Sequence, residues 1–175
     1  MITREEIAKK LAERLNRQLT AIQLTHWAKG VMFDYFEKKQ TYEPDHADLI
    51  ESSILRLSSA SKNYRTFLFD AEIIRLLRSL GQVNQHSSST QELYNINIII
   101  GQHNSQSRAV IASIQDYIPT DRDLQVRQQG SGVVITALKM NETEIGELAT
   151  RIQRHSFVMS LEDYQPTEAN LLNPP

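Results

Sequence analysis

The sequence contains no cysteine, which excludes disulfide bonds, thiolate metal sites and a cysteine nucleophile. It also lacks long apolar runs: those present, such as residues 98–100, are far shorter than the roughly 20 residues that a membrane-spanning helix needs. Residues 3–6, Thr-Arg-Glu-Glu, are unlike a signal peptide. We therefore expect a cytoplasmic protein with no membrane partner.

A strong excess of charge of either sign is absent as well. The net charge is −2; residues 1–82 carry 13 basic and 11 acidic side chains, and residues 83–175 carry 6 and 10. Proteins that bind nucleic acid through its phosphates usually have a marked basic excess, so this balance disfavours nucleic acid as a partner. With 40% hydrophobic and 23% charged residues over 175 positions, the composition is typical of a globular protein of one domain or two very small ones.

Residues 1–81 have the pattern of four helices. Thr3 with Glu6, and Thr20 with Gln23, have the spacing of a capping box, which satisfies free N–H groups at a helix start. Apolar residues then recur every three or four positions, as on the buried face of a helix. The first two helices are therefore predicted to run to about residue 16 and through about residue 35.

Pro44 interrupts this pattern, because the residue before a proline disfavours the helical conformation. Asp45 is predicted to cap a third helix over about residues 46–57. A fourth helix is predicted from about residue 70 to Gly81, a glycine suited to the C′ position. We expect Leu24 and Trp27 to lie in the core of this helical part.

After a polar linker, residues 82–91, the pattern changes to that of a small sheet with two helices. Apolar and polar residues alternate over 94–100, which is the period of a strand. A helix follows and ends at Pro119, and strands at 124–128 and 132–139 flank Gly130 and Gly132, glycines that can supply positive φ in a hairpin turn. Asn141 with Glu144 is predicted to cap the next helix, and 157–159 to form a short last strand.

This order, β-α-β-β-α-(β), is that of ferredoxin-like folds. The sequence therefore predicts an α+β fold, in which a helical bundle of about four helices, residues 1–81, packs on a ferredoxin-like unit, residues 92–160. Residues 161–175 are predicted to be a tail. In such a unit both helices cover one face of the sheet, which leaves the other face for solvent, a partner or a second copy of the chain.

Motifs for chemistry are sparse. The turn at 101–105, between a strand and a helix start, has one glycine and no lysine after it, so an ordinary turn capped by Ser105 is favoured over a phosphate site. The five histidines have no metal-ligand spacing, the paired acids suit helix caps and surface, and no Gly-x-Ser-x-Gly elbow occurs. We predict no catalytic residue, no metal, no cofactor and no enzymatic activity.

The first helix has basic residues on a face expected to be exposed, namely Lys9, Lys10, Arg14 and Arg17. With residues 19–29 as a recognition helix, this face suggests a DNA-binding regulator. The acids Glu5, Glu6 and Glu13 lie among these bases at spacings suited to pairs within the helix, as on an ordinary solvated face. DNA binding is kept as an alternative.

Acidic residues gather between the second and third helices, beside tyrosines expected to be exposed. Aromatic side chains supply contact area and carboxylates steer a basic partner, so we predict a protein-binding surface here. Lys38 and Lys39 dilute its charge, and an ordinary charged loop explains the same residues equally well. The candidate partner-binding residues, termed the acidic segment below, are Asp34, Tyr35, Glu37, Tyr42, Glu43, Asp45, Asp48 and Glu51.

Residues 2–81 resemble small bacterial immunity proteins of the colicin D type. The resemblance is carried by a capped first helix, a short Leu-Thr turn and a second helix bearing Trp-Ala, at residues 2–8, Leu11, Leu15, Leu19, Thr20, Leu24, Trp27 and Ala28. It implies a cytoplasmic protein that neutralises a toxin domain, often a cationic nuclease, by covering its active site. It carries over no individual contact residue.

We therefore expect a non-catalytic protein for protein–protein interaction, most concretely an immunity-type toxin inhibitor. Two other classes stay open: an ACT-like small-molecule sensor, which would use residues 92–160, and the DNA-binding regulator. A homo-oligomer formed through the sheet is a further expectation.

Overall fold

The computed structural model describes residues 1–82, 93–101, 105–119, 122–155 and 157–164, and it confirms a mixed α+β protein. The chain forms two compact units, Met1–Thr90 and Gln91–Pro175. The packing of one unit on the other stays a prediction. The predicted linker beyond Gln82 and the predicted tail beyond Tyr164 lie outside the described residues.

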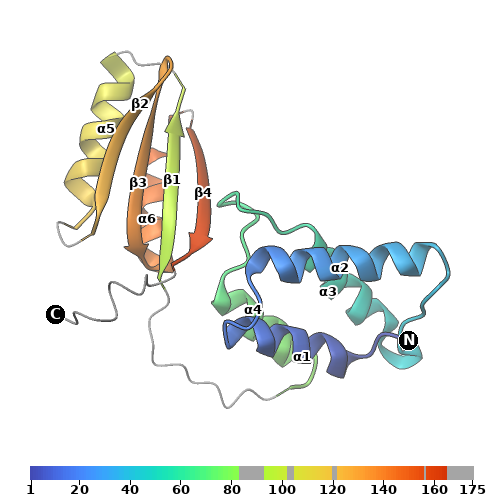
Figure 1. The fold of residues 1–175 in the computed structure, drawn as a ribbon. Coiled ribbons are helices and arrows are strands. Elements are labelled where there is room, and N and C mark those ends of the chain that lie inside the picture. Colours follow the sequence, from blue (N-terminus) through green and yellow to red (C-terminus); the bar gives the residue numbers. More distant parts are fainter. Residues whose placement is uncertain (83–92, 102–104, 120–121, 156, 165–175) are drawn as a thin grey trace. The chain divides into compact units, whose positions relative to one another are not determined.

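The helical unit, Met1–Thr90, contains four α-helices and one short 3-10 turn in its described part (Figure 1). Helix α2 begins with a complete capping box: Thr20 Oγ1 accepts from the Gln23 N–H at 3.2 Å, and Gln23 Oε1 accepts from the Thr20 N–H at 2.8 Å. At α1, Thr3 Oγ1 accepts from the Glu6 N–H at 3.2 Å, which is one half of the same motif. The elements are α1 (Arg4–Leu15), α2 (Ala21–Phe36), η1 (Pro44–His46), α3 (Ala47–Ser58) and α4 (Asp70–Ser79).

The prediction that Asp45 caps the third helix was wrong. Asp45 lies inside the 3-10 turn η1, and α3 begins at Ala47 without a capping side chain. The reason is Pro44, whose fixed φ suits the first position of a helical turn, so that the chain begins to coil before Asp45.

Apolar side chains from α1, α2, α3 and α4 form one buried cluster in this unit. Leu24 is fully buried in it, and Trp27 packs against it while partly exposed. Burying each large aliphatic side chain contributes about 1.5–3 kcal/mol to stability, so this cluster is the main source of the unit's cohesion. Its fully buried members include Ile7, Leu11, Leu24, Ile50, Leu57, Leu68 and Ile73.

Arg14 does not belong to an exposed basic face, which corrects the sequence-based expectation. Its side chain is 0% exposed, with its NH2 nitrogen 3.7 Å from Asp70 Oδ1 at the start of α4. Position 14 follows Ile7 and Leu11 at helical spacing, so it points to the core. Arg17 also reaches Asp70, at 3.1 Å. The DNA-binding alternative therefore loses one of its four exposed bases.

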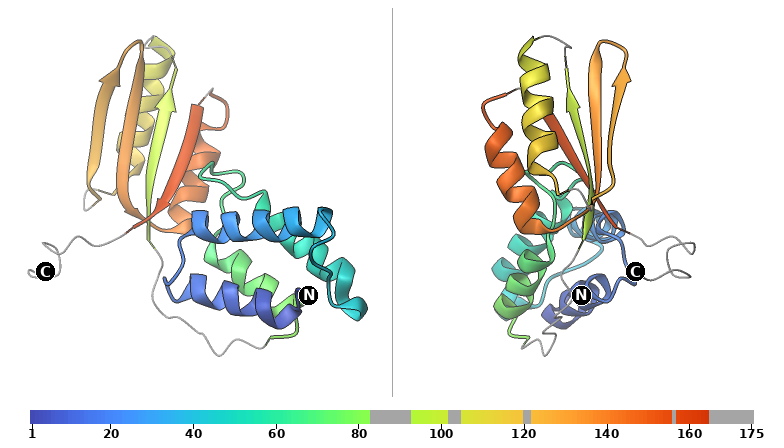
Figure 2. Two further views of the ribbon diagram at one scale, coloured as in Figure 1. Left: turned by 45° about the vertical axis from the view of Figure 1, so that its right-hand side comes forward. Right: turned by 90° about the vertical axis from the view of Figure 1, so that its left-hand side faces the viewer.

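In its described residues, the sheet unit, Gln91–Pro175, has four strands in the order β2-β3-β1-β4, and every neighbouring pair is antiparallel. Figure 2 shows helices α5 and α6 on one face of this sheet. That face, termed the inner face, carries the fully buried Ile96, Ile98 and Ile135. The elements are β1 (Tyr94–Ile100), α5 (Ser105–Tyr117), β2 (Leu124–Gln129), β3 (Gly132–Met140), α6 (Glu142–Ile152) and β4 (Phe157–Asp163).

The last strand is longer than predicted. It continues to Asp163, so that residues 161–163, assigned to the tail from the sequence, belong to the sheet. The reason is that Leu161 continues the alternation begun at Met159, and both side chains are buried against the rest of the unit.

The two hairpin glycines between β2 and β3 have different roles. Gly130 has a φ of 59°, the positive value that a turn of this kind needs. At Gly132 the reason is space, because a Cβ atom there would lie 2.8 Å from the carbonyl oxygen of Ile100 on the neighbouring strand. Any larger residue at position 132 would therefore force β3 away from β1.

No helix in the described part of the chain is both long and apolar enough to cross a membrane.

Candidate protein-binding surface

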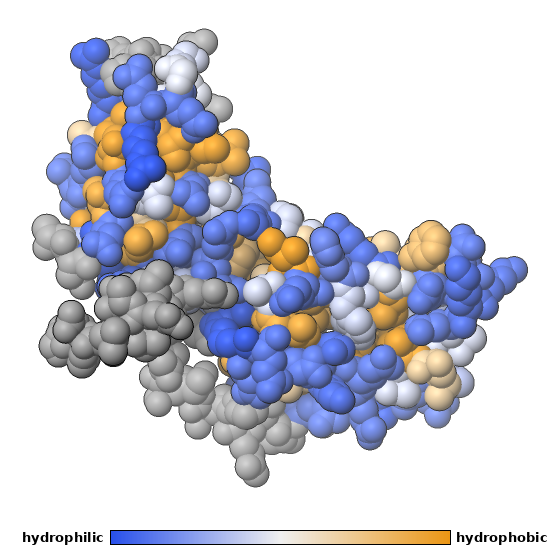
Figure 3. Space-filling view, in the orientation of Figure 1, coloured by the Kyte–Doolittle hydropathy of each residue, from blue (hydrophilic) through white to orange (hydrophobic). Residues whose placement is uncertain are grey.

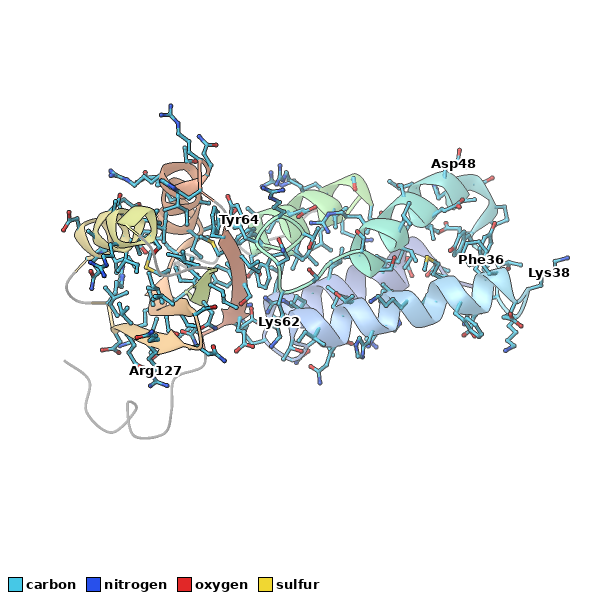
Figure 4. The ribbon with its side chains drawn as sticks, turned by 90° about the horizontal axis from the view of Figure 1, so that it is seen from above. Phe36, Lys38, Asp48, Lys62, Tyr64 and Arg127 are labelled. Atoms are coloured by element: carbon cyan, nitrogen blue, oxygen red, sulfur yellow. The ribbon has the colours of Figure 1, made fainter. Side chains whose placement is uncertain are left out.

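The structure places the acidic segment at one end of the helical unit, where α2 ends and α3 begins. The side chains of Glu37, Asp45, Asp48 and Glu51 are exposed there, while Asp34 is half-buried. Figure 4 shows Phe36, Lys38 and Asp48 together at this end of the unit. Four of the six predicted carboxylates are thus available to a partner on one part of the surface.

Tyr42 is not an exposed anchor, contrary to the sequence-based expectation. It is only 6% exposed, because its ring stacks on Tyr35 with centroids 4.1 Å apart and its backbone forms a parallel bridge with Ile2. Burial, followed by the neighbouring Glu51 carboxylate and Tyr35, raises the pKa of the Tyr42 hydroxyl. Tyr35 is itself half-buried and packs on the core. This tyrosine pair therefore packs beneath the exposed carboxylates of the acidic segment.

Glu43 is engaged within the chain. Its carboxylate accepts hydrogen bonds from the Arg4 backbone N–H at 3.1 Å, from Nε at 3.4 Å and from NH2 at 3.2 Å. These hydrogen bonds, side chain first, and the charge of Arg4 lower the pKa of Glu43 below the ordinary value of 4.5. Glu43 therefore ties the loop before α3 to the start of α1.

This lowered pKa makes part of the stability dependent on pH. Since the folded pKa lies below the unfolded one, the contribution is present above the unfolded pKa and is lost as the pH falls through the folded pKa. We expect Glu43→Gln to lower the urea midpoint near neutral pH, and the difference from wild type to shrink as the pH falls through the folded pKa of Glu43. Trp27 fluorescence measures the unfolding. Glu37→Gln, at an exposed carboxylate, is the matched control; an equal effect of both variants at neutral and at acidic pH would contradict the assignment.

Two exposed aromatic rings lie beside the acidic segment, on α2. Phe33 is 58% exposed and Phe36 is 69% exposed, and Ile22 at the other end of the helix is 42% exposed. Figure 3 shows hydrophobic residues at the surface near the C-terminal end of α2. The Phe36 ring lies 6.0 Å from that of Tyr35, and Lys39 Nζ lies 5.4 Å from the centre of the Phe33 ring. We define the α2–α3 surface as Phe33, Phe36, Glu37, Asp45, Asp48 and Glu51.

Phe33 and Phe36 are not among the partner-binding residues predicted from the sequence. A signal for both was present, because the buried face of α2 is formed by Leu24, Ala28 and Val31. On a helix with 3.6 residues per turn, Phe33 lies on the side opposite to these residues, and Phe36 lies about 60° from Phe33 at the end of the helix. Two large aromatic rings on the polar side of an amphipathic helix indicate a contact surface rather than a core.

A second cluster, between α5 and α6 of the sheet unit, is structural. The Tyr117 hydroxyl donates to Glu147 Oε2 at 2.7 Å, and the Arg151 guanidinium lies 4.6 Å from the centre of the ring. Burial, then the hydrogen bond to Glu147, raises the pKa of Tyr117 to about 12. The phenol is therefore protonated at neutral pH and acts as a hydrogen-bond donor. Arg122 and Glu144 add an ion pair of 2.9 Å nearby.

Within the described residues, histidine, aspartate and glutamate form no group of three or more that could hold a metal ion. His86 and His103 lie outside these residues, as do residues 102–104 of the turn considered above as a phosphate site.

Comparison of the chain with protein-family models, with curated proteins and with solved structures found no match.

Proposed function

We propose that this chain is a non-catalytic, cytoplasmic binding protein, most concretely an immunity-type inhibitor that binds and neutralises a basic toxin domain. The observation that carries the proposal is the α2–α3 surface, where exposed phenylalanines adjoin exposed carboxylates. Aromatic residues are enriched at the centre of protein interfaces, and charges around them steer a partner of opposite sign. The surface lies in the part of the chain that resembles colicin D-type immunity proteins.

The titratable groups support a binding role over a catalytic one. In the described part of the chain, Tyr42, Glu43 and Tyr117 are three groups with shifted pKa values. Each belongs to a contact that holds elements together: a stacked ring pair, an ion pair between a loop and α1, and a hydrogen bond between two helices. A catalytic site differs from this arrangement, because its groups with shifted pKa values are gathered in one cleft.

The direct test uses a toxin domain encoded by the neighbouring gene. The purified chain is expected to bind that domain in a pull-down and to abolish its activity at equimolar concentration. A correctly folded chain that neither binds nor inhibits would overturn the proposal.

Charge reversal at Asp45 and Asp48 is expected to slow association with that toxin domain by about tenfold at low salt, because opposed potentials speed the encounter. It should also make the rate less sensitive to salt, with little effect on folding, since neither side chain caps α3. Stopped-flow association at several salt concentrations measures both effects. The control is reversal at Glu5 and Asp116, two exposed acids elsewhere; an unchanged rate in the Asp45 and Asp48 variant would remove this segment from the interface.

We further propose that the sheet unit has the ferredoxin-like arrangement. Its support is the strand order β2-β3-β1-β4 together with the two helices on one face. The same order favours an ACT-like small-molecule sensor as the second candidate function. A thermal-shift screen of the full chain against amino acids and nucleotides separates the two: a saturable rise in melting temperature would favour the sensor.

A further inference from the structure

The face of the sheet opposite α5 and α6, termed the outer face, has a row of apolar residues that ends in a base. Val158, Ile99 and Val134 lie side by side on β4, β1 and β3, and Arg127 completes the row on β2. Val158 is 54% exposed and Ile99 is 46% exposed. Figure 4 shows Arg127 pointing away from the two helices.

Most of the rest of the outer face is polar, but Leu138 on β3, two residues beyond Thr136, adds a further apolar side chain. In the second row, Asn97 lies between Ser160 and Thr136, whose hydroxyl donates to Asn97 Oδ1 at 2.7 Å. In the third row, Asn95 lies beside the exposed Glu162 on β4. Arg127 and Glu162 are therefore on opposite edge strands and at opposite ends of the face. A second base, Lys139, stands at the bulge of β3 opposite Asn95, with its Nζ 5.7 Å from the centre of the Tyr164 ring.

This diagonal arrangement makes the outer face complementary to itself. Three strand spacings separate Arg127 from Glu162 across the sheet, or about 14 Å, and four residues separate their rows along it, or about 13 Å. The diagonal thus runs at about 45° to the strands. A two-fold axis that lies in the plane of the face and is perpendicular to this diagonal places each Arg127 opposite Glu162 of the partner subunit.

The same axis passes close to Val158, which then meets its own copy, with Ile99 beside it. The strands of the two sheets cross at about 90°, which is one of the two common modes of sheet-on-sheet packing. A single two-fold rotation thus brings the apolar row and both charges of one copy into contact with those of the other.

We propose that a second copy of this chain docks on the outer face and forms a two-fold symmetric dimer. The sheet offers a footprint of about 400 Å² on each copy, from its strand spacing and length. Stable interfaces usually bury about 800 Å² per partner. We therefore expect a weak dimer. The outer face belongs to the sheet unit and the α2–α3 surface belongs to the helical unit. The proposed dimer and the proposed toxin binding can therefore be tested, and can fail, independently of each other.

Sedimentation velocity of the full chain, from low to high micromolar concentration, tests the proposal. As the concentration rises, the average mass of the sedimenting species is expected to rise from the monomer value of 20.1 kDa towards twice that value. Arg127→Glu and Glu162→Arg should each weaken the dimer by about tenfold, and the double exchange should restore it, because the pairs re-form with their signs reversed. Val158→Lys should abolish the dimer, since it places like charges on the axis.

Arg108→Glu, at an exposed position on α5, is the matched control and should leave the dimer unchanged. Circular dichroism verifies the fold of every variant. A chain that stays monomeric at all concentrations, as it would if another segment covered the outer face, overturns the proposal. So does a dimer that is insensitive to these substitutions, or one that the double exchange does not restore.

Discussion

Asp70→Ala is expected to lower the free energy of unfolding of the helical unit by about 3–5 kcal/mol. Asp70 is 9% exposed and lies 3.7 Å from Arg14, whose side chain is fully buried. Removing the carboxylate leaves the guanidinium charge in the interior without this partner, and transferring a charge out of water is costly. Urea unfolding followed by Trp27 fluorescence measures the loss, because Trp27 packs against the core of the same unit.

Two further variants separate the buried charge from general disruption of the core. Replacing both residues, with Arg14→Met and Asp70→Leu, should recover most of the loss, since an apolar pair of similar volume needs no compensating charge. Glu13→Ala, which removes a half-buried pair with Lys10 at 2.7 Å within α1, should cost about 0.5 kcal/mol or less. A loss of less than about 1 kcal/mol for Asp70→Ala would contradict the role given to this pair.

Combined replacement of Phe33 and Phe36 by alanine is expected to weaken binding of the toxin domain by about 30-fold or more. This corresponds to at least about 2 kcal/mol, as for aromatic hot spots at the centre of interfaces. The stability of the free chain should change little, because both rings are more than half exposed. Isothermal titration calorimetry measures the affinity, and urea unfolding measures the stability.

Ile22→Ala is the matched control, because Ile22 lies on the exposed side of α2 but at its other end. Tyr42→Ala provides the opposite contrast: it should lower stability markedly, since the ring is buried and stacked on Tyr35. Unchanged affinity in the double phenylalanine variant would place the interface elsewhere on the chain.

Much of the fold was predictable from local features of the sequence. Thr20 with Gln23, and Asn141 with Glu144, form complete capping boxes, and Gly81 has the positive φ of a C′ residue. The predicted hairpin strands at 124–128 and 132–139 are observed as β2 and β3. Caps, turns and periodicity depend on residues within a few positions of one another, so they are visible in the sequence.

The candidate site was less predictable. The end of α2 and the start of α3 were recognised as acidic and aromatic, but Tyr35 and Tyr42 were taken as the anchors, whereas Phe33 and Phe36 are the rings that the structure exposes. Which ring is covered depends on contacts between segments far apart in the chain. The bridge between Ile2 and Tyr42 is one such contact.

The sequence by itself determined the class of the protein: mixed α+β, with helices in its first half and a small antiparallel sheet with two helices in its second. Only the tertiary structure decided that Arg14 is buried beside Asp70, that Glu43 is held by Arg4, and that Arg127 and Glu162 lie at opposite corners of the sheet. The physical reason is the distance along the sequence over which each interaction acts. Hydrogen bonding and apolar periodicity act along the chain, whereas the burial of a charge and the composition of a surface depend on every segment that packs around them.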